Sequence, residues 1–194
     1  MSDVSGAFDH VDSERLCDKL RSFGVDPRLV SLVASWLRAR SGRVVVGGQQ
    51  SRPIIMEDMA HQGTVWGPPL WNSFFSDSLF AVRAEQFEEV MYADDLNAWR
   101  SLASDISDDQ ASALLRGCQA SLHAWGRANR VRFDASKENF RILSRSRAPG
   151  DNFKILGIHF DTNLIMADAV EKCVSDASWR LYTLIRTRRF HTDA

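Results

Sequence analysis

The chain has 194 residues, a hydrophobic content of 44% and a net charge of −1, which suits one domain with a substantial core and excludes a histone-like basic protein. No apolar run reaches the roughly 18 residues of a membrane span, and no leader segment precedes Asp3, so we expect an intracellular protein, cytoplasmic or nuclear, without a membrane partner. Three scattered cysteines exclude a disulfide framework, and Cys17, Cys118 and Cys173 are predicted to be small core residues.

The first forty residues predict a short strand and two helices. The strand ends near residues 2–4. Asp12 is a suitable N-cap for a first helix, which Gly24 ends. Asp26 and Pro27 suit the start of a second helix, and apolar residues repeat at helical spacing after both caps.

A hairpin and a core helix are predicted next. Arg43–Val46 and Pro53–Met56 are rich in β-branched residues and flank Gly47 and Gly48, a pair typical of a hairpin turn. Pro53 favours an edge strand. The helix that follows is expected to bury five residues: Leu70, Trp71, Phe74, Phe75 and Leu79.

The remaining elements complete an α+β pattern without repeats or linkers. Glu89–Trp99 predicts a strand, a tight acidic turn and a second strand. A long amphipathic helix is expected from Asp108. Phe140–Leu143 and Phe153–Phe160 look like short strands, and a last amphipathic helix is predicted between Val170 and Ile185.

Two adjacent aspartates, Asp94 and Asp95, lie at the tip of the predicted acidic turn. Two carboxylates a few ångströms apart repel each other, and a divalent cation relieves that repulsion directly. An ordinary turn that tolerates aspartate is the alternative. With Asp3, three carboxylates from neighbouring strands suffice for two Mg²⁺ ions roughly 3.5–4 Å apart, as in polymerases, and Mn²⁺ is able to substitute.

Five segments in order resemble the palm motifs of reverse transcriptases, over roughly residues 2–162. They are DVSGAFDHV, HQGTVWGPPLWNSFFSD, MYADD, RVRFDASKENFRIL and FKILGIHFD. The resemblance implies a ferredoxin-like antiparallel sheet packed against helices. It also implies an RNA-directed DNA polymerase that uses an RNA template, a DNA primer and dNTPs. The helical spacer and the Gln-Gly-x-x-x-Gly-Pro form of the second motif are most similar to non-LTR retrotransposon enzymes, with group II intron enzymes as the alternative.

The resemblance also assigns the metal site. It implies that Asp3 and Asp94 are the principal ligands, that Asp95 takes part more weakly, and that Val4 adds a contact to the metal and the substrate. In such a site one ion activates the primer 3′-hydroxyl and the other stabilises the departing pyrophosphate.

Further residues match positions that bind nucleotide or primer in the family. Phe8 lies where a bulky side chain excludes a 2′-hydroxyl, and Gln62 and Gly63 match the dipeptide beside the incoming nucleotide. Lys137 matches the lysine near the triphosphate, a catalytic role, with a solvated surface lysine as the alternative. The pair Leu156 and Gly157 would form the primer grip, or a simple bend in a strand. Basic residues outnumber acidic ones over 111–194, and these arginines either contact backbone phosphates or cover a solvated face.

The resemblance predicts a palm over residues 1–164, truncated at its N-terminus and lacking fingers. Residues 165–194 are predicted to form a helix that either begins a thumb or is solvated. The missing regions of a larger polyprotein would be partners. Because Asp3 lies at a free end, we expect weak polymerase activity or none from the isolated chain. A non-catalytic nucleic-acid-binding remnant and a metal-dependent nuclease are the competing hypotheses.

Overall fold

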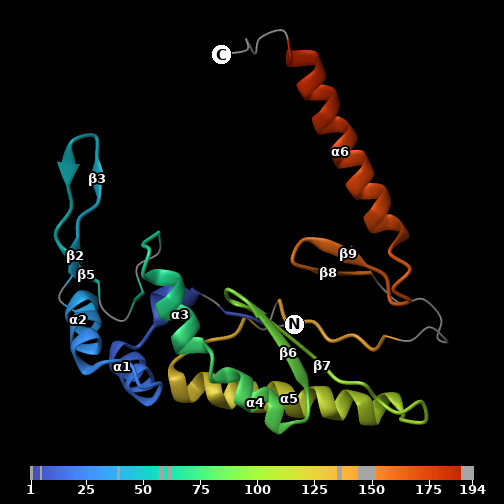
Figure 1. Cartoon of the computed structure of the whole chain (residues 1–194), viewed down its shortest axis with the longest axis horizontal. Helices are drawn as coiled ribbons and strands as arrows, with labels where there is room; N and C mark the ends of the chain where they lie inside the picture. Colours follow the sequence, from blue (N-terminus) through green and yellow to red (C-terminus); the bar gives the residue numbers. More distant parts are fainter. Residues whose placement is uncertain are drawn as a thin grey trace. The chain divides into compact units, whose positions relative to one another are not determined.

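A computed structural model describes residues 2–4, 6–38, 40–56, 59–60, 63–134, 137–143 and 152–188, with only the backbone described at residues 2 and 3. The chain divides into two compact units, Met1–Asn139 and Phe140–Ala194, and each is described by itself. Both units contain helices and small antiparallel sheets (Figure 1). The expected α+β class is therefore confirmed. Among the described residues, no helix combines the length and the apolar character that crossing a membrane requires.

The first unit contains a three-stranded antiparallel sheet in the order β1-β7-β6. The strands are β1 (Ser2–Asp3), β6 (Glu88–Tyr92) and β7 (Asp95–Trp99). Residue Tyr92 pairs with Asp95, so only two residues connect β6 to β7. Strand β1 pairs with β7 on the side away from β6. The predicted strand, acidic turn and second strand are confirmed.

The two early helices begin at the predicted caps. They are α1 (Ser13–Ser22) and α2 (Pro27–Leu37). The carboxylate of Asp12 accepts a hydrogen bond of 3.0 Å from the backbone N–H of Arg15, and Asp26 accepts one of 2.7 Å from that of Arg28. Each bond satisfies a backbone donor that a helix start otherwise leaves unpaired. The caps therefore fix both helix starts locally.

The predicted hairpin forms, but with different strand partners. Its four strands are β2 (Arg40–Gly42), β3 (Val45–Val46), β4 (Gln49–Gln50) and β5 (Ile54–Met56). Gly47 and Gly48 have φ values of 56° and 79°, which a turn with two left-handed central residues requires. Because this two-residue turn sets the register, β3 pairs with β4, and β5 reaches back to β2.

The predicted core helix is broken in two. Its parts are α3 (Gly67–Phe75) and α4 (Ser78–Ala84). The Lys19 ammonium donates to the Phe74 carbonyl at 2.6 Å and to the Asp77 carboxylate at 2.7 Å. Since that carbonyl would otherwise continue the helical hydrogen bonding, the contact accounts for the end of α3. Burial lowers the pKa of Lys19, and Asp77 opposes this shift.

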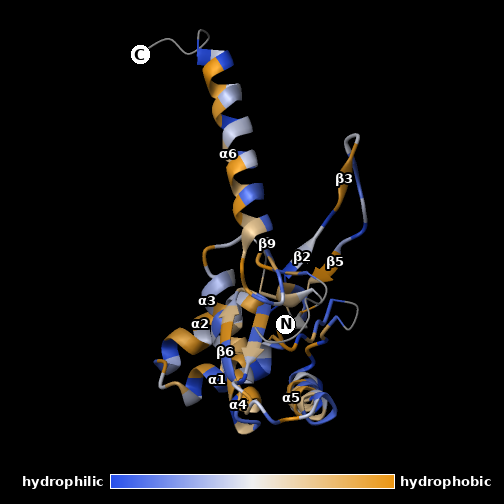
Figure 2. Cartoon of the chain, turned by 90° about the vertical axis from the view of Figure 1, so that its right-hand side faces the viewer, coloured by the Kyte–Doolittle hydropathy of each residue, from blue (hydrophilic) through white to orange (hydrophobic). Residues whose placement is uncertain are grey.

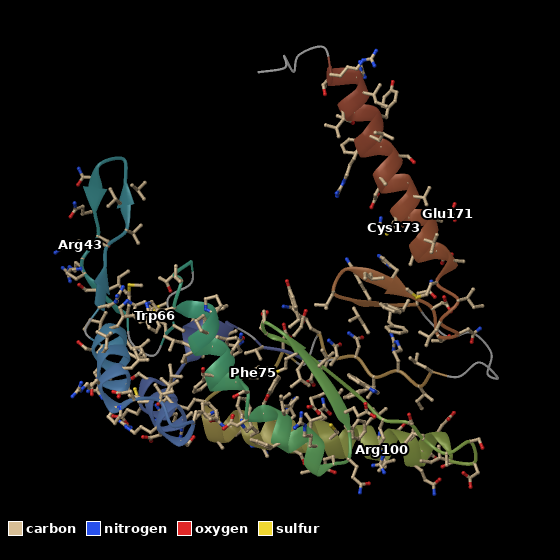
Figure 3. All side chains as sticks on the ribbon, in the orientation of Figure 1. Arg43, Trp66, Phe75, Arg100, Glu171 and Cys173 are labelled. Atoms are coloured by element: carbon tan, nitrogen blue, oxygen red, sulfur yellow. The ribbon has the colours of Figure 1, made fainter. Side chains whose placement is uncertain are left out.

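The core of the first unit is built from buried residues of α1, α2, α3, α4, β7 and the long helix α5 (Asp108–Asn129). Helix α4 packs on both α5 and β6 (Figure 1). Phe75 of α3, labelled in Figure 3, is fully buried. Its ring stacks on Trp71 with centroids 4.9 Å apart and meets Trp125 of α5 edge-on at 5.3 Å. This aromatic cluster joins the two helices.

The second unit contains a hairpin and a helix. Its elements are β8 (Phe153–Ile155), β9 (Ile158–Phe160) and α6 (Ala167–Thr187). The strand predicted at 140–143 is wrong, because those residues pair with no strand in the described part of the chain. Cys17 and Cys118 are buried as predicted, but the prediction for Cys173 is wrong. It is exposed on α6 (Figure 3), where hydrophobic and hydrophilic residues alternate in bands (Figure 2).

Candidate active site

The acidic turn between β6 and β7 is strained at its first residue. Ala93 has a φ of 55°, a left-handed value that costs a residue with a Cβ atom about 1–3 kcal/mol. Asp94 follows in the turn, and Asp95 begins β7; both are half-buried. A strained backbone that carries two partly buried carboxylates persists only where its surroundings hold it.

Strand β1 brings the first motif beside this turn. The backbone of Asp3 pairs directly with that of Asp95, and the side chain of Asp3 lies outside the described part. The next residue, Val4, is 3% exposed and forms an isolated bridge with Phe133. The first motif therefore pairs with the third motif through Asp3 and with the fourth motif through Val4.

The residue just before the second motif is joined to the first motif through a backbone hydrogen bond. The N–H of Ala60, two residues before Gln62, donates to the carbonyl of Phe8 at 2.8 Å. Phe8 is half-buried in the short 3-10 helix η1 (Ala7–His10). Gly63 is exposed, with a φ of 81° that favours glycine. Gln62 lies outside the described residues.

The fourth motif is fastened to α5 by a residue that sequence analysis did not single out. The Glu138 carboxylate is buried and lies 2.7 Å from Nε2 of His123, and Gln119 also donates to it. Its neighbour Lys137 has a side chain that is 60% exposed, 3.7 Å from the carboxylate of Asp134. A buried glutamate requires hydrogen-bonding partners. In the sequence, the available signal was that Glu138 follows Lys137 within the fourth motif.

Trp71 is the second residue that sequence analysis missed as a contributor to the site. Its predicted place in the core is confirmed, with 1% exposure. Its Nε1–H donates to the carbonyl of Ala93 at 2.9 Å, and its ring lies 5.9 Å from that of Phe8. A tryptophan on a buried helix face has an N–H that must find an acceptor, and this was the available signal.

The proposed primer-grip residues lie in the second unit. Leu156 and Gly157 form the turn between β8 and β9, with φ values of 47° and 85°, and both are exposed. The turn pairs Ile155 with Ile158. The single predicted strand is therefore a two-stranded hairpin.

The carboxylates near the turn are suitable donors for a hard divalent cation such as Mg²⁺. Among the described side chains, no group of three His, Cys, Asp or Glu residues could hold a metal ion. The described side chains near the turn supply two carboxylates, Asp94 and Asp95. The backbone register offers Asp3 as the source of the third.

Comparisons with known proteins identify the family. No curated protein matches the chain. Residues 1–160 match the family described as reverse transcriptase (RNA-dependent DNA polymerase). Enzymes of this family copy a primed nucleic-acid template with dNTPs and generally use divalent metal ions. The match covers most of the chain, which therefore belongs to the reverse transcriptase family.

Proposed function

We propose that this chain is the palm of an RNA-directed DNA polymerase of the non-LTR retroelement type. One observation carries the proposal: the third motif, the fourth motif and the residue just before the second motif all meet the first motif at β1 and η1. Residue 3 pairs with residue 95, Val4 bridges to Phe133, and the Phe8 carbonyl accepts from Ala60. Segments that are far apart in the sequence thus meet where nucleotide transfer would occur.

The proposed metal ligands are Asp3 and Asp94, with Asp95 and Val4 beside them. The short turn and its strain support this assignment, because strained backbone concentrates at functional sites. These residues would hold two Mg²⁺ ions, which would supply charge to activate a primer 3′-hydroxyl and to offset the charge of the leaving pyrophosphate. Asp95 begins β7, in which Leu96 and Asn97 are buried, and Asp94 lies in the turn just before it.

The nucleotide would be positioned by residues of the first, second and fourth motifs. Phe8 would exclude a 2′-hydroxyl, which favours dNTPs over ribonucleotides. Gln62 and Gly63 would lie against the incoming nucleotide, where a glycine permits close approach of the backbone. The exposed ammonium of Lys137 would neutralise the departing pyrophosphate.

The subtype and the primer contact are also proposals. The form of the second motif and the helical spacer, now α1 and α2, favour the non-LTR type. Leu156 and Gly157 would contact the primer near its end, because an exposed turn with a glycine lets the backbone approach another chain closely. Residues 1–164 would form the palm and 165–194 a separate helix that leads toward a thumb.

The metal site can be tested by thermal unfolding in rising concentrations of Mn²⁺. An ion that binds only the folded chain stabilises it by about 2.7 kcal/mol at 100 times its dissociation constant. We expect this gain for the wild type and for the control Asp105→Asn, which changes an exposed loop carboxylate. Asp94→Asn should lose it. A wild type that gains nothing would indicate the non-catalytic remnant, and an equal gain in Asp94→Asn would remove the assignment of Asp94.

The reaction can be tested by extension of a DNA primer on an RNA template. We expect any extension to require dNTPs and Asp94, and Phe8→Val to increase ribonucleotide incorporation relative to deoxynucleotide incorporation. Cleavage of the RNA or DNA without nucleoside triphosphates would instead favour a nuclease. Because the ratio of the two nucleotides is measured within one variant, a general loss of activity would not mimic the expected change.

A further inference from the structure

A side-chain hydrogen bond ties the acidic turn to the core. Trp71, in the middle of α3, donates its Nε1–H to the Ala93 carbonyl at 2.9 Å. An indole has a single N–H, so this bond commits the only polar group of a ring that is 1% exposed. The acceptor belongs to the residue immediately before Asp94.

This bond acts where the backbone is strained. Ala93 has a φ of 55°, and an alanine does not keep such a conformation by its own preference. The bond fixes the orientation of the Ala93–Asp94 peptide, because the carbonyl that accepts it belongs to that peptide. The direction in which the Asp94 side chain leaves the turn depends on the same peptide plane.

The Trp71 ring is itself held firmly. It stacks on Phe75 at 4.9 Å with an interplanar angle of 20°, and it contacts Phe74 at 6.2 Å. It also meets the Phe8 ring, with centroids 5.9 Å apart. The same indole therefore touches the proposed sugar-selecting residue and the turn that carries the proposed metal ligands.

We infer that Trp71 is a positioning residue that fixes the Asp94–Asp95 turn and sets its place relative to Phe8. Through this one side chain, metal binding and sugar selection depend on each other. The inference rests on the proposed function, because it takes the turn to be the metal-binding element. It assigns to Trp71 a role beyond filling the core.

The chain offers a matched control for the loss of an indole hydrogen bond. Trp125 of α5 belongs to the same aromatic cluster, meeting Phe75 at 5.3 Å. Its Nε1–H donates to the Asp77 carboxylate, also at 2.9 Å, and not to the acidic turn. Each replacement removes a hydrogen bond of 2.9 Å from this aromatic cluster, but only the Trp71 bond reaches the turn.

The experiment compares Trp71→Phe with Trp125→Phe in the full chain. Mn²⁺ affinity is measured by the electron paramagnetic resonance of free Mn²⁺, and the melting temperature is measured in the absence of metal. Groups that orient metal ligands typically contribute about 10–100-fold in affinity. We expect Trp71→Phe to weaken Mn²⁺ binding by about tenfold or more, and Trp125→Phe to leave it within about twofold, whereas both lower the melting temperature.

A second replacement removes the N–H and keeps the shape of the ring. Benzothienylalanine at position 71 carries sulfur in place of the N–H, and we expect it to weaken Mn²⁺ binding as Trp71→Phe does. Metal affinity that stays at the wild-type level with this residue would overturn the inference, as would equal losses in Trp71→Phe and Trp125→Phe. A purely structural role would lower stability in both variants without separating their metal affinities.

Asp94→Asn, measured in the same series, separates this inference from the proposed function. If Asp94→Asn abolishes Mn²⁺ binding and Trp71→Phe leaves it unchanged, the proposed metal site is supported and the positioning role of Trp71 is rejected. If Asp94→Asn binds Mn²⁺ as the wild type does, both fall together. A primer-extension assay tests the link to sugar selection. Trp71→Phe should raise ribonucleotide incorporation relative to deoxynucleotide incorporation, and Trp125→Phe should not.

Discussion

The β6–β7 and β8–β9 hairpins have turns of the same length and similar backbone geometry, but different contacts hold them in place. In both, the connection has two residues, and the first of them is a non-glycine residue at positive φ, Ala93 at 55° and Leu156 at 47°. The first hairpin gains a third strand from β1, and its turn carbonyl accepts a hydrogen bond from buried Trp71. The second hairpin pairs only within itself among the described residues, and Leu156 is 48% exposed.

The second hairpin is supported by contacts close to it in sequence. The rings of Phe153 and Phe160 stack at 5.4 Å across its strands. After β9, the Asp161 carboxylate accepts backbone hydrogen bonds from Asn163, Ile165 and Met166 at 2.7–3.0 Å. An isolated two-stranded hairpin is at best marginally stable. The core therefore sets the position of the acidic turn, whereas local hydrogen bonds and ring stacking set the position of the turn between β8 and β9.

The largest expected effect comes from removing one aromatic ring that packs near each hairpin. Phe75 is fully buried against Trp71, so Phe75→Ala should lower the free energy of unfolding by about 3–5 kcal/mol, because it leaves a cavity. Phe153 is half-buried, and Phe153→Ala should lower it by at most about 1 kcal/mol. Urea denaturation followed by tryptophan fluorescence measures both. Equal losses would contradict the contrast.

Thiol labelling compares the interior of the first unit with the surface of α6. Burial raises the pKa of the Cys118 thiol to about 11, and burial also raises the pKa of Cys17. At pH 8 only about one Cys118 thiol in a thousand is ionised, even before access is considered. Iodoacetamide at pH 8 should therefore modify exposed Cys173 first and both others only after unfolding. Mass spectrometry of the labelled peptides checks the order, and early labelling of Cys118 would show that the core is open.

Acid should loosen the segment after β9. Backbone hydrogen bonds, led by that from Ile165 and followed by that from Met166, lower the pKa of Asp161 below its ordinary value of 3.8. A lowered folded pKa means that the stabilisation is complete above the ordinary value and is lost as the pH falls through the lowered one. The hydrogen-exchange protection of Ile165 and Met166, corrected for intrinsic rates, should fall in that window.

Two variants test the cause of that loss. Asp161→Ala should remove the protection of these amides at every pH, since no acceptor remains. Asp176→Asn, on exposed α6, is the control and should preserve the wild-type profile. Protection in Asp161→Ala that still changes with acid would assign the effect to another group.

The smallest expected effect concerns the strained residues themselves. Ala93→Gly and Leu156→Gly each relieve strain in the folded chain and add freedom to the unfolded one, so each should change the free energy of unfolding by less than about 1 kcal/mol. The turns should nevertheless differ in motion. The Trp71 bond remains in Ala93→Gly, so NMR order parameters at Asp94 should stay high, whereas those at Gly157 should fall in Leu156→Gly. A fall at Asp94 would show that Trp71 does not hold the turn.

The sequence was sufficient where structure depends on neighbouring residues. Asp12 and Asp26 cap their helices because the capped N–H groups lie two or three residues away. The acidic turn was predictable for the same reason, since its strands are adjacent in the chain. Two glycines specified a tight turn after β3, but the strand partners depended on where the other strands could reach.

Contacts between distant segments were not predictable from local pattern. Residues 140–143 have a strand composition but no partner among the described strands, and composition alone does not supply one. The break after α3 depends on Lys19, more than fifty residues away from the carbonyl that it binds. The bond from Trp71 to Ala93 likewise joins residues whose contact only the folded chain creates. Which residues take part in the site stays a prediction from the motifs, whereas the contacts that hold the acidic turn come from packing.

An anomalous difference map of the chain crystallised with Mn²⁺ tests most directly whether the acidic turn and β1 form a metal site. We predict a peak in contact with the carboxylate of Asp94, between the acidic turn and β1, with the Asp3 carboxylate as a further ligand. Mn²⁺ bound elsewhere, or a saturated crystal without a peak beside Asp94, would contradict it.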